Sequence, residues 1–328
     1  MLRGVALCGI VWLNVPAITH FSYGSEPVHN LAPWLEPLLR GRFIGMFAAL
    51  FGVSFALILN SARQRHPRPR LVLARRLGIL LGLGVLHGLL QPGEVLTEYA
   101  LFGLLLLLPL SYLRWRWVPL ALGVAALLAA AILHLEPGYN DLGMMLLGFG
   151  AARLGWPARW EHPGRGTALT GVLLLPAYAT GLVLQQTVTS PVVNGSAAAY
   201  TWADFAAGVV GAVFYGTVIV LLLRTSLRPV IRAVFEPLGR LALSNYLGAT
   251  LLAVLARVVL DATSTMTSSS TAPDLLVSAA ILLIQVPVSR WWLTRFRFGP
   301  AEWLWRCATW WQRLPNRRQP AQSTPASA

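Results

Sequence analysis

Long apolar runs, separated by short polar gaps, follow one another along nearly the whole chain. A helix needs about 20 mostly apolar residues to cross the hydrocarbon core of a bilayer. Runs near this length lie at roughly 4–22, 43–60, 73–91, 98–113, 117–134, 140–155, 167–186, 203–223, 238–260 and 274–293. The pattern predicts an all-α, polytopic transmembrane helical bundle of about ten spans. The fourth and sixth runs are short, which also permits tilted, partly buried or re-entrant helices.

The basic residues fall in alternate gaps between these runs. All 26 are arginines, and 23 of them lie at the N-terminus, after the even-numbered runs or within the C-terminal segment. Only Arg40, Arg42 and Arg257 break the alternation. Because cytoplasmic loops carry the excess of arginine and lysine, both termini are predicted to be cytoplasmic. A cleaved signal peptide is the alternative for the first run, but Asn14 and the lack of a small-residue cleavage site before His20 favour retention.

The chain changes character after the last run. From Glu302 to Leu314, apolar Trp303, Cys307 and Trp310 recur at helical spacing beside polar residues. Such a helix can lie flat in the headgroup layer, or it can pack on the cytoplasmic ends of the bundle. The predicted organisation is a transmembrane helical bundle over residues 1–300, an amphipathic interfacial helix over 301–314 and a disordered tail over 315–328.

Composition supports a membrane protein and argues against nucleic-acid binding. The chain is 56% hydrophobic and 12% charged, with a mean hydropathy of +0.61, whereas soluble domains carry roughly 25% charged residues. The net charge of +14 does not sit on one solvated face, as a nucleic-acid binder requires, but at the ends of apolar runs, opposite anionic lipid headgroups. Abundant arginine and alanine without lysine indicate a GC-rich bacterial genome, and hence a multi-pass protein of the bacterial cytoplasmic membrane.

Several polar residues gather in the predicted outer half of the bundle. His87 ends the third run, Glu94 and Glu98 follow the next turn, and Asn14 and His20 lie late in the first run. Polar and ionisable groups inside a membrane are costly, so each is a functional candidate. A histidine beside a carboxylate suits general-base catalysis or proton relay. The structural alternative is a histidine that only bonds a backbone carbonyl.

Arginines suggest two anion-binding positions. Arg42 opens the second run from the outside, where it can hold a carboxylate or an anionic part of a substrate. At the cytoplasmic start of the ninth run, Arg240 with Asn245 and Tyr246 could contact a phosphorylated donor such as acyl-CoA. No metal site is predicted, because neither zinc-type cysteine and histidine spacing nor a His-Glu-x-x-His motif occurs.

Four glycines in the third run form two small-xxx-small pairs, Gly78 with Gly82 and Gly84 with Gly88. In membranes such pairs let another helix approach closely. We therefore expect helix packing within the bundle along this run, and no dimer is implied.

Motifs spread over residues 2 to about 306 resemble a known family. They are Leu2-Arg3-Gly4-Val5-Ala6-Leu7 with Asn14, Phe47-Ala48-Ala49-Leu50-Phe51-Gly52, His87-Gly88-Leu89-Leu90 with Gly93-Glu94-Val95-Leu96, Gly143-Met144-Met145-Leu146-Leu147-Gly148, Gly239-Arg240-Leu241-Ala242-Leu243-Ser244-Asn245-Tyr246-Leu247 and Phe298-Gly299-Pro300-Ala301-Glu302-Trp303-Leu304-Trp305-Arg306. Together they resemble the YeiB-like family of bacterial polytopic membrane proteins, which is defined by a domain of unknown function. Glu94 departs from the family pattern, which more often has aspartate there, and the family usually begins several residues earlier.

The resemblance leaves the activity open. The Leu-Arg-Gly…Asn opening is distantly similar to transmembrane acyltransferases, which implies by analogy an acyl or group transferase acting on an extracytoplasmic acceptor. His87 or His20 would then be the base, Glu94 would orient it, and a small-molecule or lipid-linked substrate would bind. The alternatives are a transporter or exporter of a small or amphiphilic molecule and a non-catalytic scaffold. A cavity from a cytoplasmic donor site to His87 would favour transfer, and a gated central site would favour transport.

Overall fold

The chain is almost entirely helical, as predicted. A computed structural model describes residues 1–19, 34–39, 41–91, 93–133, 137–161, 164–188, 192–193, 196–197, 202–262 and 272–318. The helices are α1 (Leu2–Thr19), α2 (Glu36–Leu39), α3 (Arg42–Arg65), α4 (Pro69–Gly88), α5 (Val95–Phe102), a π-helical turn η2 (Gly103–Leu107), α6 (Leu108–Leu110), α7 (Val118–Ile132), α8 (Pro137–Arg153), α9 (Trp156–Glu161), α10 (Arg165–Thr187), α11 (Trp202–Leu222), α12 (Arg228–Arg240), α13 (Ala242–Ala262), α14 (Ala272–Arg295) and α15 (Pro300–Trp310). The short strands β1 (Val192–Val193) and β2 (Ser196–Ala197) pair antiparallel.

Seven helical segments of the described residues are long and apolar enough to cross a membrane. They are Leu2–Thr19, Glu36–Arg65, Pro69–Gly88, Arg165–Thr187, Trp202–Leu222, Ala242–Leu260 and Ala272–Arg295. Their outer faces carry large apolar side chains that no protein group covers, among them Val172, Leu276 and Leu283, each at least 67% exposed. Soluble proteins rarely expose so much apolar surface, and lipid is the solvent that suits it. The chain is a multi-span membrane protein.

The predicted count of ten spans is not supported, because three of the predicted spans form short helices. The fourth becomes the segment Val95–Leu110 and the fifth Val118–Ile132, of 15 residues. A helix of that length reaches only about 23 Å, less than the roughly 30 Å hydrocarbon core. The sixth forms α8, of 17 residues, which packs between α3 and α7. Seven segments therefore meet the length criterion.

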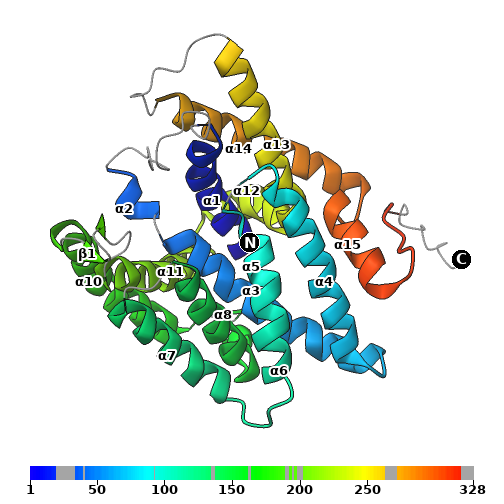
Figure 1. Cartoon of the computed structure of the whole chain (residues 1–328), viewed down its shortest axis with the longest axis horizontal. Helices are drawn as coiled ribbons and strands as arrows, with labels where there is room; N and C mark the ends of the chain where they lie inside the picture. The colour runs from blue at the N-terminus through cyan, green and yellow to red at the C-terminus, as the bar shows by residue number, and fades with distance from the viewer. Residues whose placement is uncertain are drawn as a thin grey trace, which may run out of the picture.

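The helices form two groups around α1 and α3 (Figure 1). On one side α7, α8, α10 and α11 pack together, and α3 contacts both α8 and α11. On the other side lie α4, α13, α14 and α15. The first helix, α1, touches α3, α12, α13 and α14. Residues from α1, α3, α4, α5 and α13 are thereby brought to one central region.

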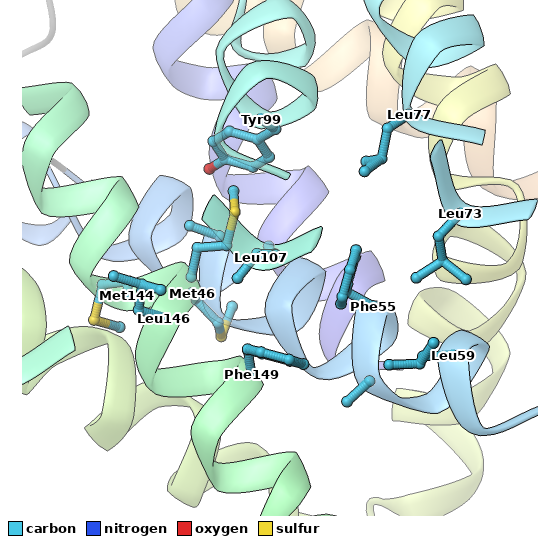
Figure 2. Close-up of a cluster of buried hydrophobic side chains, with 14 of the residues drawn as sticks. Met46, Phe55, Leu59, Leu73, Leu77, Tyr99, Leu107, Met144, Leu146 and Phe149 are labelled. Atoms are coloured by element: carbon cyan, nitrogen blue, oxygen red, sulfur yellow. The ribbon is translucent and has the colours of Figure 1, made fainter. Parts of the chain in front are cut away.

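An apolar cluster fills the space beside α3 (Figure 2). Met46 and Phe55 of α3 pack with Phe149 of α8, and Leu77 and Tyr99 join from α4 and α5. Close contact of α3 with α8 depends on Gly148, where an added Cβ would overlap the carbonyl of Ala49. The cluster fixes the positions of α3, α4 and α5, which carry the wall of the site described below.

The start of the predicted ninth span differs from expectation. A separate helix, α12, ends at Arg240, and α13 begins only at Ala242. In α12, Ile231 and Leu238 are buried while Arg228 and Arg232 are exposed. This two-faced pattern suits a helix packed on the bundle end, because one stripe is buried and the other is solvated.

The C-terminal helix packs on the bundle, which was one of the two predicted arrangements. Trp305 of α15 donates its indole N–H to the carbonyl of Arg76, at 2.8 Å, while Leu304 and Trp311 stay exposed. The tail predicted to be disordered from residue 315 is ordered at its start. Residues 315–318 bond the end of α14, for example from the N–H of Arg318 to the carbonyl of Arg295, because backbone groups at a helix end need partners. Residues 319–328 lie outside the described residues.

Candidate functional site

His87 lies in the last turn of α4 and is almost completely buried. Its Nε2 is 3.0 Å from the hydroxyl of Thr250 on α13, and that hydroxyl donates to Oε1 of Gln91 at 2.6 Å. The Thr250 proton is thus engaged with Gln91, so Thr250 accepts from His87. This network assigns the proton of a neutral His87 to Nε2 and leaves a lone pair on Nδ1.

The free nitrogen of His87 faces a carboxylate. Nδ1 has no hydrogen-bond partner among the described residues, and it lies 3.7 Å from Oε2 of Glu94. In the neutral ring, Nδ1 presents a lone pair to a negative charge, whereas the protonated ring presents an N–H. A histidine nitrogen with a lone pair beside a carboxylate is the arrangement expected of a general base.

Glu94 is held in place as the N-cap of α5. Its side chain accepts from the N–H groups of Leu96 and Thr97, at 2.7 and 2.8 Å. Burial raises the pKa of the Glu94 carboxyl, but the nearby His87 ring and the hydrogen bonds at the start of α5 outweigh burial and keep the pKa below its usual value of 4.5. Gly84 of α4 permits this position, because a Cβ there would lie 2.5 Å from the nitrogen of Thr97 and 2.9 Å from Oε1 of Glu94.

Tyr246 of α13 stands beside the histidine, with ring centroids 5.0 Å apart. Its hydroxyl is buried, and Asn14, Gln91 and the backbone of Val95 lie around it. None of the described groups meets full hydrogen-bond geometry with that hydroxyl. An unsatisfied buried hydroxyl costs free energy, so its presence suits a group that bonds a ligand oxygen.

A cavity of about 150 Å³ borders this network at Tyr246, whereas His87 and Glu94 are not among its lining residues. Its walls are mostly apolar and come from α3 and α4, through Phe47, Phe51, Phe55, Leu77 and Leu80. Figure 2 shows Phe55 and Leu77 on facing helices. Ligand sites are typically apolar hollows with a few placed polar groups, as here.

The two ends of the cavity differ in chemistry. At one end lie the hydroxyl-bearing rings of Tyr99 and Tyr246. At the other end, Arg3, Arg76 and Arg306 line the wall. The cavity therefore extends from a group of arginines to Tyr246, which stands beside His87, and this arrangement suits a molecule with an anionic head and an apolar or extended remainder.

Several residues predicted from the sequence come together. His87, Glu94, Asn14 and Tyr246 lie in one network, and Glu98 of α5 is close enough for the charge of Glu94 to act on it. His20, the other predicted base, lies outside the described residues.

Arg42 does not join this network. It is fully buried, donates from Nη2 to Oε1 of Gln185 at 2.8 Å, and lies 5.8 Å from the ring of Tyr178. These partners belong to α10, and the first turn of α3 faces α11. The prediction that Arg42 completes the His87 site is corrected, because α3 presents its start to α10 and α11 and not to α4.

Arg240, Asn245 and Tyr246 do not form the single site that the sequence suggested. Arg240 lines the cavity, whereas Asn245 donates to the hydroxyl of Ser289 on α14 at 2.9 Å. Successive residues of a helix point about 100° apart, so Tyr246 faces His87 while Asn245 faces α14. Asn245 is thus a buried polar contact between helices.

Sequence reasoning missed Gln91, Thr250, Arg3, Arg76 and Glu302 as parts of this region. One signal was present: Arg3 precedes Asn14 by 11 residues in α1, and Arg76 precedes His87 by 11 residues in α4. Eleven residues are about three helical turns, so each pair lies on one face. Nothing in the sequence indicated that Thr250 of α13 would reach α4.

Comparison with known proteins finds relatives in bacteria along nearly the whole chain. Residues 151–312 match the family described as "Protein of unknown function (DUF418)". An uncharacterized 39.9 kDa protein from the amylase 3' region of Bacillus acidopullulyticus is 30% identical, over 96% of this chain and 93% of that protein. YxaH of Bacillus subtilis and YeiB of Escherichia coli are 26% and 28% identical, each over at least 94% of both chains. The resemblance seen in the motifs is thereby confirmed, and the chain belongs to the DUF418 family.

Proposed function

We propose that this protein is a transmembrane acyl or related group transferase of the bacterial cytoplasmic membrane, with His87 as general base. The observation that carries the proposal is buried His87, whose Nδ1 makes no hydrogen bond among the described residues and lies 3.7 Å from Glu94, beside Tyr246 in the wall of a cavity that arginines also line. A base–carboxylate pair beside a hollow is the usual arrangement for activating a nucleophile.

The reaction would proceed as follows. An acceptor hydroxyl gives its proton to Nδ1 of His87 while its oxygen attacks the carbonyl carbon of the donor. The hydroxyl of Tyr246 donates to the oxyanion that forms, and Glu94 stabilises the imidazolium. The bond to the leaving atom then breaks, and that atom takes the proton from His87. The acceptor leaves as an ester. The remainder of the donor, which has lost its acyl group, leaves with the proton on its leaving atom.

The orientation that fits this proposal has both termini in the cytoplasm. The alternation of arginines supports it. It also requires that the short segments Val95–Leu110, α7 and α8 cross the membrane, bringing the count to ten. The basic end of the cavity then faces the cytoplasm and the His87 network lies in the outer half, so a cytoplasmic donor would meet an extracytoplasmic acceptor that is a small molecule or lipid-linked.

Transport of a small or amphiphilic molecule is the alternative, since an apolar cavity can also hold cargo. Transport needs no base with a free nitrogen at the end of the cavity, which is why the His87–Glu94 pair favours transfer.

The test is transfer by the purified protein in nanodiscs. Radiolabelled acetyl-CoA would be incubated with bacterial lipid and glycan extracts, and labelled products would be resolved by chromatography. We expect His87→Gln to lower turnover about 10²- to 10⁴-fold, the usual contribution of a general base. The control is His66→Gln, which changes a histidine between α3 and α4 outside the cavity. Equal turnover in His87→Gln and wild type, or movement of an unmodified solute by the wild type, would contradict the proposal.

A further inference from the structure

Three arginines from three helices converge at one end of the cavity. Arg3 comes from α1, Arg76 from α4 and Arg306 from α15, and all three line the cavity. The charge of Arg306 acts on Arg3 and Arg76, the charge of Arg3 acts on Arg76, and Glu302 is the acidic residue that acts on all three. Within the described part of the chain, no carboxylate forms an ion pair with any of the three guanidinium groups.

Glu302 also lines the cavity, and its single negative charge offsets only part of the charge of the three arginines. It accepts from the N–H groups of Leu243 and Ser244 at 2.7 and 3.1 Å, and from the Ser244 hydroxyl at 2.5 Å. Glu302 thus caps the start of α13. Three guanidinium groups and one carboxylate leave a net positive charge around the hollow, and this charge favours an anion within it.

Two of the guanidinium groups are held in fixed directions. Arg76 lies 3.4 Å above the ring of Trp305, and Arg3 donates to the hydroxyl of Ser54. A planar guanidinium held in this way presents a fork of N–H donors that matches the oxygens of phosphate.

The spacing of polar residues along α1 and α4 predicts the length of the ligand. Arg76 and His87 share one face of α4, with Leu80 and Gly84 between them, and Arg3 and Asn14 share one face of α1, with Ile10 between them. Eleven residues of α-helix span about 16 Å. Both helices therefore separate the basic end of the cavity from the His87 network by the same distance.

We propose that Arg3, Arg76 and Arg306 bind the phosphate of a donor whose reactive carbonyl lies about 16 Å from that phosphate. The position of the reactive carbonyl rests on the proposed function, whereas the phosphate site does not. In an acyl phosphate the two groups are bonded directly, and in a glycerophospholipid they are a few bonds apart, so neither spans the cavity. A thioester on a long phosphorylated arm, as in acyl-CoA, does. The carbonyl–sulfur bond breaks on transfer, and the sulfur leaves as a thiol with the proton from His87.

Calorimetric titration of the purified full chain in detergent tests this assignment. The ligands are acetyl-CoA, a single-chain lysophosphatidate and inorganic pyrophosphate. We expect acetyl-CoA to bind, and Arg76→Lys and Arg306→Gln each to weaken binding about 10-fold or more, as loss of a charged hydrogen bond implies. Arg313→Gln removes the same charge just beyond α15, outside the cavity lining, and should leave affinity unchanged. Thermal unfolding of each variant verifies that Arg76→Lys is folded, and Arg306→Gln gives an independent reading.

The outcomes separate this inference from the proposed function. Binding of acetyl-CoA that survives His87→Gln but falls in the arginine variants supports the inference, even if no transfer is ever found. Tight binding of lysophosphatidate with none of acetyl-CoA would overturn it in favour of a lipid headgroup site. Unchanged acetyl-CoA affinity in both arginine variants would overturn it as well.

Discussion

The hydroxyl of Thr250 determines which nitrogen of His87 is available for chemistry. It accepts a hydrogen bond from Nε2 and donates a hydrogen bond to Gln91. Nδ1 is therefore the nitrogen that faces Glu94. A histidine held by two partners of this kind has one tautomer in its neutral form. The chemistry of the site thus depends on a threonine that never contacts Glu94.

Thr250→Val keeps the shape of the side chain and removes both bonds. We expect a loss of about 1–3 kcal/mol in the free energy of unfolding, because the N–H of His87 and the oxygen of Gln91 lose their partner. We also expect slower turnover, because His87 can then hold either tautomer. Thr217→Val is the control, since that hydroxyl bonds only the carbonyl of Val213 in its own helix. Denaturation in detergent and the transfer assay measure the two effects, and equal losses in both variants would contradict this role of Thr250.

Glu94 makes stability depend on pH in a defined direction. Its folded pKa lies below the usual 4.5, so the charged form stabilises the fold. That contribution is complete above the unfolded pKa and is lost as pH falls through the lower folded pKa. Glu94→Gln should remove this acid-induced loss, which thermal unfolding over a pH series measures. Glu236→Gln, in an exposed pair with Arg232, should keep the wild-type profile. An unaltered profile in Glu94→Gln would show that the carboxylate is not stabilised as described.

At the scale of helices, packing against α5 selects one glycine of α4. The sequence shows four, but an added Cβ at Gly78 or Gly82 would meet nothing within 4 Å, and at Gly88 it would make an ordinary contact. Only Gly84 lies against the backbone of α5. This approach brings the N-cap carboxylate of α5 to the histidine of α4.

Gly84→Ala should displace the start of α5. The added methyl meets a backbone nitrogen, which cannot move as a flexible side chain can, and overpacking of this kind costs about 1–3 kcal/mol. We expect lower thermal stability together with lower turnover. Gly82→Ala, two residues earlier on the same helix, should be neutral or slightly stabilising. Similar effects of the two substitutions would mean that the contact with α5 does not position Glu94.

At the scale of the whole molecule, the number of crossings decides whether Arg65 and Trp310 lie on the same side of the membrane. Seven segments cross by length alone, and ten cross if the three short segments are included. Between Arg65 and Trp310 the first count gives an odd number of crossings and the second an even number. The scheme with seven crossings therefore places Arg65 and Trp310 on opposite sides of the membrane. The scheme with ten crossings places them on the same side.

Cysteine labelling distinguishes the schemes. In a background without Cys8 and Cys307, single cysteines would replace Arg65, Trp310, Asn194 or Ser269, the last two outside the described residues. We expect an impermeant maleimide to label positions 194 and 269 in intact cells, and positions 65 and 310 only after permeabilisation. Labelling of position 65 from outside would overturn the proposed orientation.

The sequence by itself determined the membrane class, the family and most helices, because apolar runs and flanking arginines reflect the bilayer directly. It also placed Glu94 near His87, since a tight turn joins their helices. Tertiary packing decided the rest. Thr250 and Tyr246 reach His87 from α13, and Arg42 turns to α10, because contacts between distant helices leave no local pattern. Likewise, eleven-residue spacing fixes a length along each helix, but only the packing of α1, α4 and α15 brings their arginines to one cavity.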